Sequence, residues 1–180
     1  MRPISPSSHR PTMSGHNSIS DAYIQDLITS AVNNVCSTMV RKEATFIRRL
    51  EARDFRVSAQ EAHFFGCVGF RGQINGLVHL CIPDNFAQHA ASVILGMKPD
   101  EMMMQGEDMV GDVIGEITNM TVGNFKNALC DMGYSCKLTI PRVVRGINPN
   151  MEILQSSRRH IFHFDCHKES LVADIQVVGG

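Results

Sequence analysis

The spacing of hydrophobic residues divides the chain into helical and extended stretches. Apolar residues recur every three or four positions in three ranges, which predicts helices at residues 20–40, 84–95 and 107–132. Short apolar or alternating runs predict extended segments, which are residues 45–57, 63–70, 76–82, 135–145, 159–166 and 171–178. The ranges between them predict a methionine-rich linker or short helical turn at residues 97–106 and a loop at residues 146–157.

Local signals support the ends of these helices. Ser20 is a suitable N-cap, and Asp21 places a negative charge at the positive end of the first helix. Pro83 precedes the second helix, and Gly96 follows it as a C′ glycine. Gly133 ends the third helix in the same way.

The order of the elements indicates the fold class. Strands come in runs rather than alternating with helices, which favours an α+β domain over a doubly wound parallel sheet. Residues 71–75 contain a glycine and form the expected hairpin connection between two strands. We therefore expect an antiparallel sheet with long helices packed on one face, formed by residues 20–180.

The N-terminal residues 1–19 differ in composition from the rest of the chain. They contain Pro3, Pro6 and Pro11 and no acidic residue. There is no apolar stretch of the kind a secretory signal needs, and the prolines disfavour an amphipathic helix. A disordered tail is the expectation for this segment.

Composition and charge exclude several classes of function. The 180 residues include 17 Lys and Arg against 18 Asp and Glu, a net charge of −1, so no basic surface for nucleic acid or an anionic membrane is indicated. No apolar run approaches the length of a membrane span. The six cysteines include no C-x-x-C motif, which favours reduced thiols in a cytoplasmic protein. The function is therefore expected to reside in a local site.

The third helix has two contrasting faces. At 100° per residue its predicted core stripe consists of Val110, Val113, Ile114, Ile117, Met120, Phe125, Ala128 and Met132. The opposite face carries Asp112, Glu116, Asn119, Gly123 and Lys126. A carboxylate and a carboxamide thus stand one turn apart on an exposed face, where they can pair with a cation and orient a water molecule.

Three glycines in this helix, Gly111, Gly115 and Gly123, are unfavourable by up to about 1 kcal/mol each relative to alanine. Two interpretations stay open. A partner approaches the helix backbone closely, or the glycines let the helix pack against its own sheet, with the polar face an ordinary solvated surface.

Residues 111–126 resemble the signature helix of the CheC/CheX family of chemotaxis phosphatases. Asp112, Glu116 and Asn119 match the signature positions, and Pro141 matches its downstream proline. The spacer of residues 120–140 is one residue shorter than in the signature. The order of elements from residue 20 to residue 178 is also similar to that of the family.

The resemblance implies a fold of two pseudo-repeated halves, each with a motif helix. In the first helix Asp26, Ser30 and Asn33 have the motif spacing, but Ser30 occupies the glutamate position. This degenerate copy is expected to be inactive, which leaves one site per chain. A single site resembles CheX more than CheC, and it implies a homodimer.

The activity implied by the resemblance is hydrolysis of the aspartyl phosphate of a CheY-like response regulator, in chemotaxis or another two-component pathway. Glu116 is implied to pair with the regulator's active-site lysine and Asn119 to orient the attacking water. Asp112 is implied to support them, and Gly115 and Gly123 to permit close docking. No cofactor of its own is expected, since the Mg²⁺ belongs to the regulator.

Other functional interpretations of the sequence remain as alternatives. The main one is a non-catalytic adaptor that uses the same helix to hold a receiver domain or a flagellar switch component, and a weaker one is a structural homodimer without a phosphorylated partner. A metal site among His160, His163, Cys166 and His167 is not expected, because histidines three apart in a strand point to opposite faces.

Overall fold

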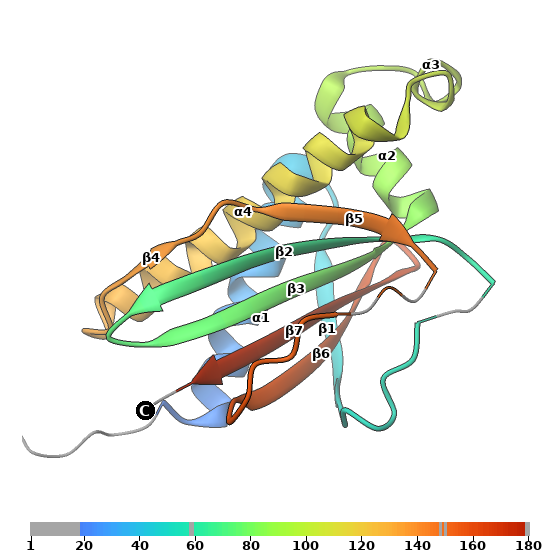
Figure 1. Cartoon of the computed structure of the whole chain (residues 1–180). Coiled ribbons are helices and arrows are strands. Elements are labelled where there is room, and N and C mark those ends of the chain that lie inside the picture. The colour runs from blue at the N-terminus through green and yellow to red at the C-terminus, as the bar shows by residue number, and fades with distance from the viewer. Residues whose placement is uncertain (1–18, 58–59, 148, 150, 179–180) are drawn as a thin grey trace, which may run out of the picture.

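A seven-stranded antiparallel sheet forms the centre of the molecule, with its long helices behind it in Figure 1. The computed structural model describes residues 19–57, 60–147, 149 and 151–178. The strands are β1 (Ala44–Leu50), β2 (His63–Gly72), β3 (Asn75–Pro83), β4 (Cys136–Leu138), β5 (Arg142–Gly146), β6 (Arg158–Cys166) and β7 (Glu169–Val178). Their order is β1-β6-β7-β3-β2, and β4 and β5 both pair with β2 along its outer edge.

The helices cover one face of this sheet, as predicted. They are α1 (Asp21–Val35), which continues into the π-helical turn η1 (Cys36–Val40), α2 (Asp84–Leu95), the short α3 (Pro99–Met103) and α4 (Glu107–Asp131). The Ser20 hydroxyl accepts a hydrogen bond from the Tyr23 amide and so caps α1, and Gly96 closes α2 with a left-handed backbone. The predicted α+β class with an antiparallel sheet is confirmed.

Two predicted strands differ from the observed ones. The segment predicted at residues 45–57 leaves the sheet after Leu50, where the Asp54 and Phe55 amides donate to the Glu51 carbonyl and form a turn. The segment predicted at residues 135–145 is divided into β4 and β5 around Pro141, which lacks an amide hydrogen for the ladder. Both differences arise from turns that apolar periodicity does not register.

The sheet has an internal two-fold pattern. A half-turn that reverses the strand order β1-β6-β7-β3-β2-β5 exchanges β1 with β5, β2 with β6 and β3 with β7. Each set of three strands follows a long helix, α1 in the first half and α4 in the second. The topology therefore agrees with the predicted pseudo-repeat and makes α1 the counterpart of α4.

The main core lies between the helices and the sheet, where Phe64, Phe70 and Phe125 are fully buried. A smaller apolar cluster on the other face packs Phe65 and Ile161 beneath the segments that follow β1 and β5. Because both faces are covered, the central strands β2, β3 and β7 are buried along most of their length.

Of the expected tail, residues 1–18 lie outside the described residues, while Ile19 is buried in the core. No helix in the described part of the chain is both long and apolar enough to cross a membrane.

Candidate functional site

The polar face predicted for the third helix is on the surface of α4. Asp112 and Glu116 are exposed, and Asn119 is partly buried. The successive spacings of four and three residues place these side chains along one face of the helix. Acidic residues Glu107 and Asp108 occupy the first turn of α4, where the helix dipole favours negative charge.

The predicted core stripe of α4 is wrong at Met120 and Met132, which are 38% and 39% exposed. The buried side of the helix instead includes Thr118, Thr121 and Leu129. The buried face of α4 differs from the predicted stripe because the helix contacts both the sheet and α1. One narrow stripe therefore does not describe its packing. The two threonines satisfy their buried hydroxyls by donating to the carbonyls of Ile114 and Ile117, four residues earlier.

Gly66 allows α4 to lie close to the sheet, whereas Gly115 makes only an ordinary contact with it. An added Cβ at Gly66 in β2 would collide with the Thr118 side chain. At Gly115, which is buried, an added Cβ would lie 3.5 Å from Val143 Cγ2 in β5. That distance is an ordinary van der Waals contact, so alanine would also fit at position 115 against β5, and Gly123 has no atom within 4 Å of an added Cβ.

A pocket of about 630 Å³ lies between the first half of α4 and β5. Asp112 and Glu116 line it from the helix, and Pro141 and Arg145 line it from the opposite side. The signature proline and the signature carboxylates are thus brought to one place although they are far apart in the chain. Asn119 is not among the lining residues and lies one turn further along α4 from Glu116.

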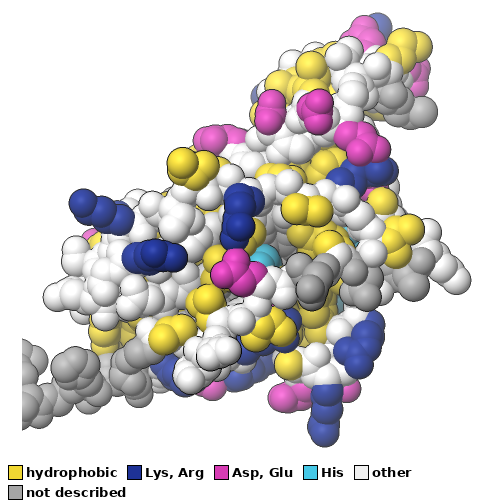
Figure 2. Space-filling view, in the orientation of Figure 1, with side chains coloured by type: hydrophobic (Ala, Val, Ile, Leu, Met, Phe, Trp, Pro, Cys, Tyr) yellow, Lys and Arg dark blue, Asp and Glu magenta, His cyan; other side chains and the backbone are white. Residues whose placement is uncertain are grey.

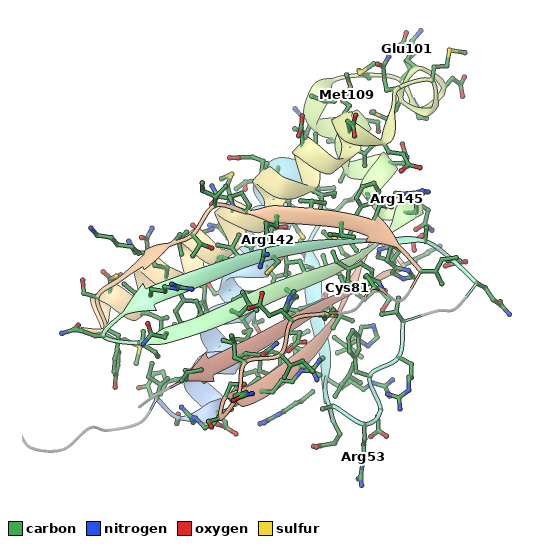
Figure 3. The ribbon with its side chains drawn as sticks, viewed as in Figure 1. Arg53, Cys81, Glu101, Met109, Arg142 and Arg145 are labelled. Carbon is green, nitrogen blue, oxygen red and sulfur yellow. The ribbon has the colours of Figure 1, made fainter. Side chains whose placement is uncertain are left out.

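Arg145 is the basic residue among those that line this pocket. Its Nε and Nη1 atoms each lie 2.6 Å from a carboxylate oxygen, of Asp84 and of Glu107 respectively. The guanidinium carbon is also 5.8 Å from the centroid of the Phe64 ring. The hydrogen bond to Asp84 raises the pKa of Arg145. Arg145 thus links the first residues of α2 and α4 to the edge strand (Figure 3).

The acids of this surface outnumber its bases. Glu107, Asp108, Asp112 and Glu116 line the pocket, and Arg145 is already paired with Glu107. Figure 2 shows acidic side chains gathered over the exposed part of α4. The surface around Glu116 therefore suits a partner that presents a cation.

The degenerate first motif lies on the surface of α1. Asp26, Ser30 and Asn33 are all exposed. Asn33 Oδ1 accepts hydrogen bonds from the Ala44 amide at 3.1 Å and from the Ser37 hydroxyl at 3.3 Å. The amide of this motif therefore holds the start of β1 against the helix, and the motif has no carboxylate at position 30.

The histidines near the C-terminus are separated by the sheet, as their spacing predicts. His160 is buried and stacks on Phe162, while His163 hydrogen bonds with Ser170 at 2.8 Å. Among the described residues no group of three or more His, Cys, Asp or Glu side chains is placed to hold a metal ion.

Comparison with known families identifies the chain. The family model described as chemotaxis phosphatase CheX matches residues 64–166, more than half of the sequence. This range contains all of α4 and Pro141. The chain belongs to the CheX family.

Solved structures share the fold of this CheX family member. A CheC-like superfamily protein from Shewanella sp. PV-4 superposes with a TM-score of 0.73 at 23% identity, covering 89% of this chain and 100% of that one. The chemotaxis protein CheX from Vibrio vulnificus gives 0.74 at 22% identity, covering 87% and 99%. A CheX–CheY–BeF3–Mg²⁺ complex from Borrelia burgdorferi gives 0.65 at 19% identity, covering 87% and 98%. No curated protein matches the chain.

Sequence reasoning did not find Arg145 or Gly66. Arg145 ends a predicted strand, and nothing local distinguishes it from other exposed basic residues. Gly66 lies inside an apolar run, where a glycine is a signal of close backbone approach. That signal was available, but it does not say which element approaches.

Proposed function

We propose that this CheX family chain hydrolyses the aspartyl phosphate of a CheY-like response regulator. The observation that carries the proposal is the pair formed by exposed Glu116 and partly buried Asn119, one turn apart on α4 beside an acidic pocket. The CheX–CheY complex of Borrelia burgdorferi supports a receiver domain as the partner.

The two side chains have separate roles in this mechanism. Glu116 pairs with the active-site lysine of the regulator and fixes the position of α4 beside the phosphoryl group. The Asn119 amide has an acceptor and two donor hydrogens, so it holds a water molecule in one orientation. The water oxygen bonds to phosphorus as the bond to the aspartyl oxygen breaks, which releases phosphate and a free carboxylate. Such catalysis is mostly positioning.

The surroundings of the pair support these roles. Asp112 adds negative charge one turn before Glu116, which favours the approach of a cation. Gly123 leaves the surface open one turn after Asn119. The Mg²⁺ of the reaction belongs to the regulator, and this chain supplies no cofactor. One site per chain is proposed, because Ser30 lacks the carboxylate and Asn33 holds β1.

The test is the decay of a phosphorylated CheY-like receiver domain with its Mg²⁺. We expect the wild-type chain to accelerate decay at substoichiometric amounts. Glu116→Ala and Asn119→Ala should each reduce the acceleration by about 100-fold or more, because a misplacement of the reacting groups by about 1 Å costs that much. Ser30→Ala is the matched control, since position 30 is the counterpart of Glu116 on α1, and it should retain full activity.

The main alternative is an adaptor that binds a receiver domain through α4 without chemistry. It predicts that the wild-type chain binds the phosphorylated receiver and leaves its decay rate unchanged. That result would replace the phosphatase proposal. A homodimer and a cytoplasmic location stay predictions.

A further inference from the structure

The face of the sheet away from the helices holds a second, smaller pocket. It has a volume of about 200 Å³ and lies between β2, β3, β5 and the segment that follows β5. Gly66 faces α4, so its neighbours Phe65 and Cys67 point to the opposite face. Figure 2 shows a histidine at the bottom of a hollow on this face, between a basic and an acidic side chain. The sheet therefore separates this pocket from Glu116 and Asn119 on α4.

Cys67 and His79 are direct neighbours on adjacent strands in this pocket. Cys67 of β2 is in register with His79 of β3. Residues directly opposite one another in an antiparallel pair point to the same face, with their Cβ atoms about 5 Å apart. Both side chains line the pocket. The strand register thus places a thiol beside an imidazole.

The His79 ring has bonding capacity that the described residues do not use. The residue is 4% exposed, and its Nδ1 atom is buried without a hydrogen-bond partner. Burial lowers the pKa of this ring, so it is neutral at pH 7 and one nitrogen keeps a lone pair. A buried polar group without a partner is unfavourable. The pocket therefore favours a ligand that bonds to the imidazole.

The segment beside the pocket is fixed to the sheet and supplies a thioether. Gln176 of β7 is fully buried, accepts from the Leu154 amide at 2.7 Å and donates to the Glu152 carbonyl at 3.0 Å. The same segment places Met151 in the pocket lining, where it packs against the apolar cluster that contains Phe65. A second sulfur therefore joins the thiol and the imidazole.

The charged residues of the pocket satisfy one another. Arg142 of β5 is in register with Cys67, on the side of β2 opposite to His79, and its Nη2 donates to Glu152 Oε2 at 2.9 Å (Figure 3). The carboxylate is thereby engaged, and no three His, Cys, Asp or Glu side chains in the described part of the chain are placed for a metal. Structural Zn²⁺, which needs four ligands, is not suited to this pocket. Thiolate, thioether and imidazole are instead ligands that select Cu(I).

We propose that Cys67, His79 and Met151 form a binding site for a soft monovalent metal ion, Cu(I). The ion replaces the hydrogen of the Cys67 thiol, which leaves as a proton, and accepts lone pairs from the His79 ring and the Met151 sulfur. No electron is transferred. Burial raises the pKa of the free thiol, so the ion displaces a bound proton. The charges of Cu(I) and the thiolate cancel, which suits an apolar pocket beside the Arg142–Glu152 pair.

The test is a competition for Cu(I) between the folded, reduced full chain and the chelator bicinchoninate, in the absence of oxygen. An excess of chelator keeps the free ion too scarce for isolated thiols to bind it. We expect the wild-type chain to remove one equivalent of Cu(I), and X-ray absorption of that complex to show nitrogen and sulfur ligands together. The proposal is overturned if the chain does not compete, or if the bound ion has sulfur ligands alone.

Variants assign the ligands to this pocket. Cys67→Ser and His79→Gln should each weaken Cu(I) binding by about 100-fold or more, because losing even an outer-shell partner costs about 10–100-fold. Met151→Leu should weaken it by about tenfold. Cys130→Ser and Met120→Leu are the matched controls, since both residues are partly solvent-exposed and lie outside the pocket, and they should bind as the wild type does. Circular dichroism checks folding, and unchanged affinity in Cys67→Ser or His79→Gln overturns the proposal.

Discussion

Glu116 and Asp174 are two carboxylates in opposite environments. Glu116 stands on the surface of α4, where it contributes little to packing and is free to meet a partner. Asp174 is 1% exposed in β7, and Arg159 donates to both of its oxygens, from Nε at 3.0 and 3.1 Å and from Nη2 at 2.7 Å. Burial makes the second carboxylate depend on its partner in a way that the first does not.

Removing one partner of the buried pair should destabilise the chain. We expect Arg159→Met to lower the free energy of unfolding by about 3 kcal/mol, because it leaves the Asp174 charge buried without its cation. The double variant Arg159→Met/Asp174→Leu should regain most of that loss. Urea unfolding of the two variants and the wild type measures the difference, and a double variant as unstable as the single one would contradict this account.

The position of α4 is decided by the contact between a helix and a strand. Thr118 of α4 occupies the space above Gly66 of β2 that any larger residue would need. On the outer surface of the same helix Gly123 has open space. Gly66 at the interface therefore tolerates no added side chain, whereas Gly123 on the outer side of α4 does.

Alanine substitution should distinguish these glycines. Gly66→Ala places a Cβ 2.9 Å from Thr118 Cβ, and we expect a loss of about 1–3 kcal/mol from overpacking. Gly123→Ala is the matched control and should raise stability by up to about 1 kcal/mol, because alanine is the better helix former. Chemical denaturation of both variants is the measurement. Equal effects in the two variants would show that α4 can shift away from β2 at no cost.

Buried histidines affect the stability of the whole molecule. His79 and His160 are 4% and 1% exposed. Burial lowers the pKa of both rings below the ordinary 6.5. At His160 the Arg49 and Arg158 charges act in the same direction, and Asp21 partly opposes them. The folded chain therefore resists protonation that the unfolded chain accepts.

Stability should consequently fall in mild acid. Below pH 6.5 the unfolded state binds more protons than the folded state, so the free energy of unfolding decreases as the pH falls. We expect a loss of about 2 kcal/mol between pH 7.5 and pH 5.5 from two such histidines. His160→Phe should make the dependence shallower. Urea titrations at both pH values test this, and an unchanged slope in the variant would rule out His160 as a contributor.

Local sequence signals were reliable where a helix end is encoded by a few neighbouring residues. The bounds of α2 follow from Pro83 and Gly96, because both act through backbone geometry that needs no partner. The predicted first strand extended to residue 57, beyond the observed end of β1 at Leu50. The break between β4 and β5 was missed, because residues 135–145 were predicted as one strand. Strand ends depend on neighbouring strands, which the local pattern does not show.

The sequence by itself determined the α+β class, the polar face of α4 with Asp112, Glu116 and Asn119, and the missing carboxylate at Ser30. These are properties of residue type and helical periodicity. Only the tertiary structure decided that Pro141 and Arg145 face those carboxylates across one pocket, that Gly115 faces Val143 rather than solvent, and that Met120 is exposed. The reason is that contacts between distant segments depend on how α4 lies on the sheet, which the periodicity of a single helix does not specify.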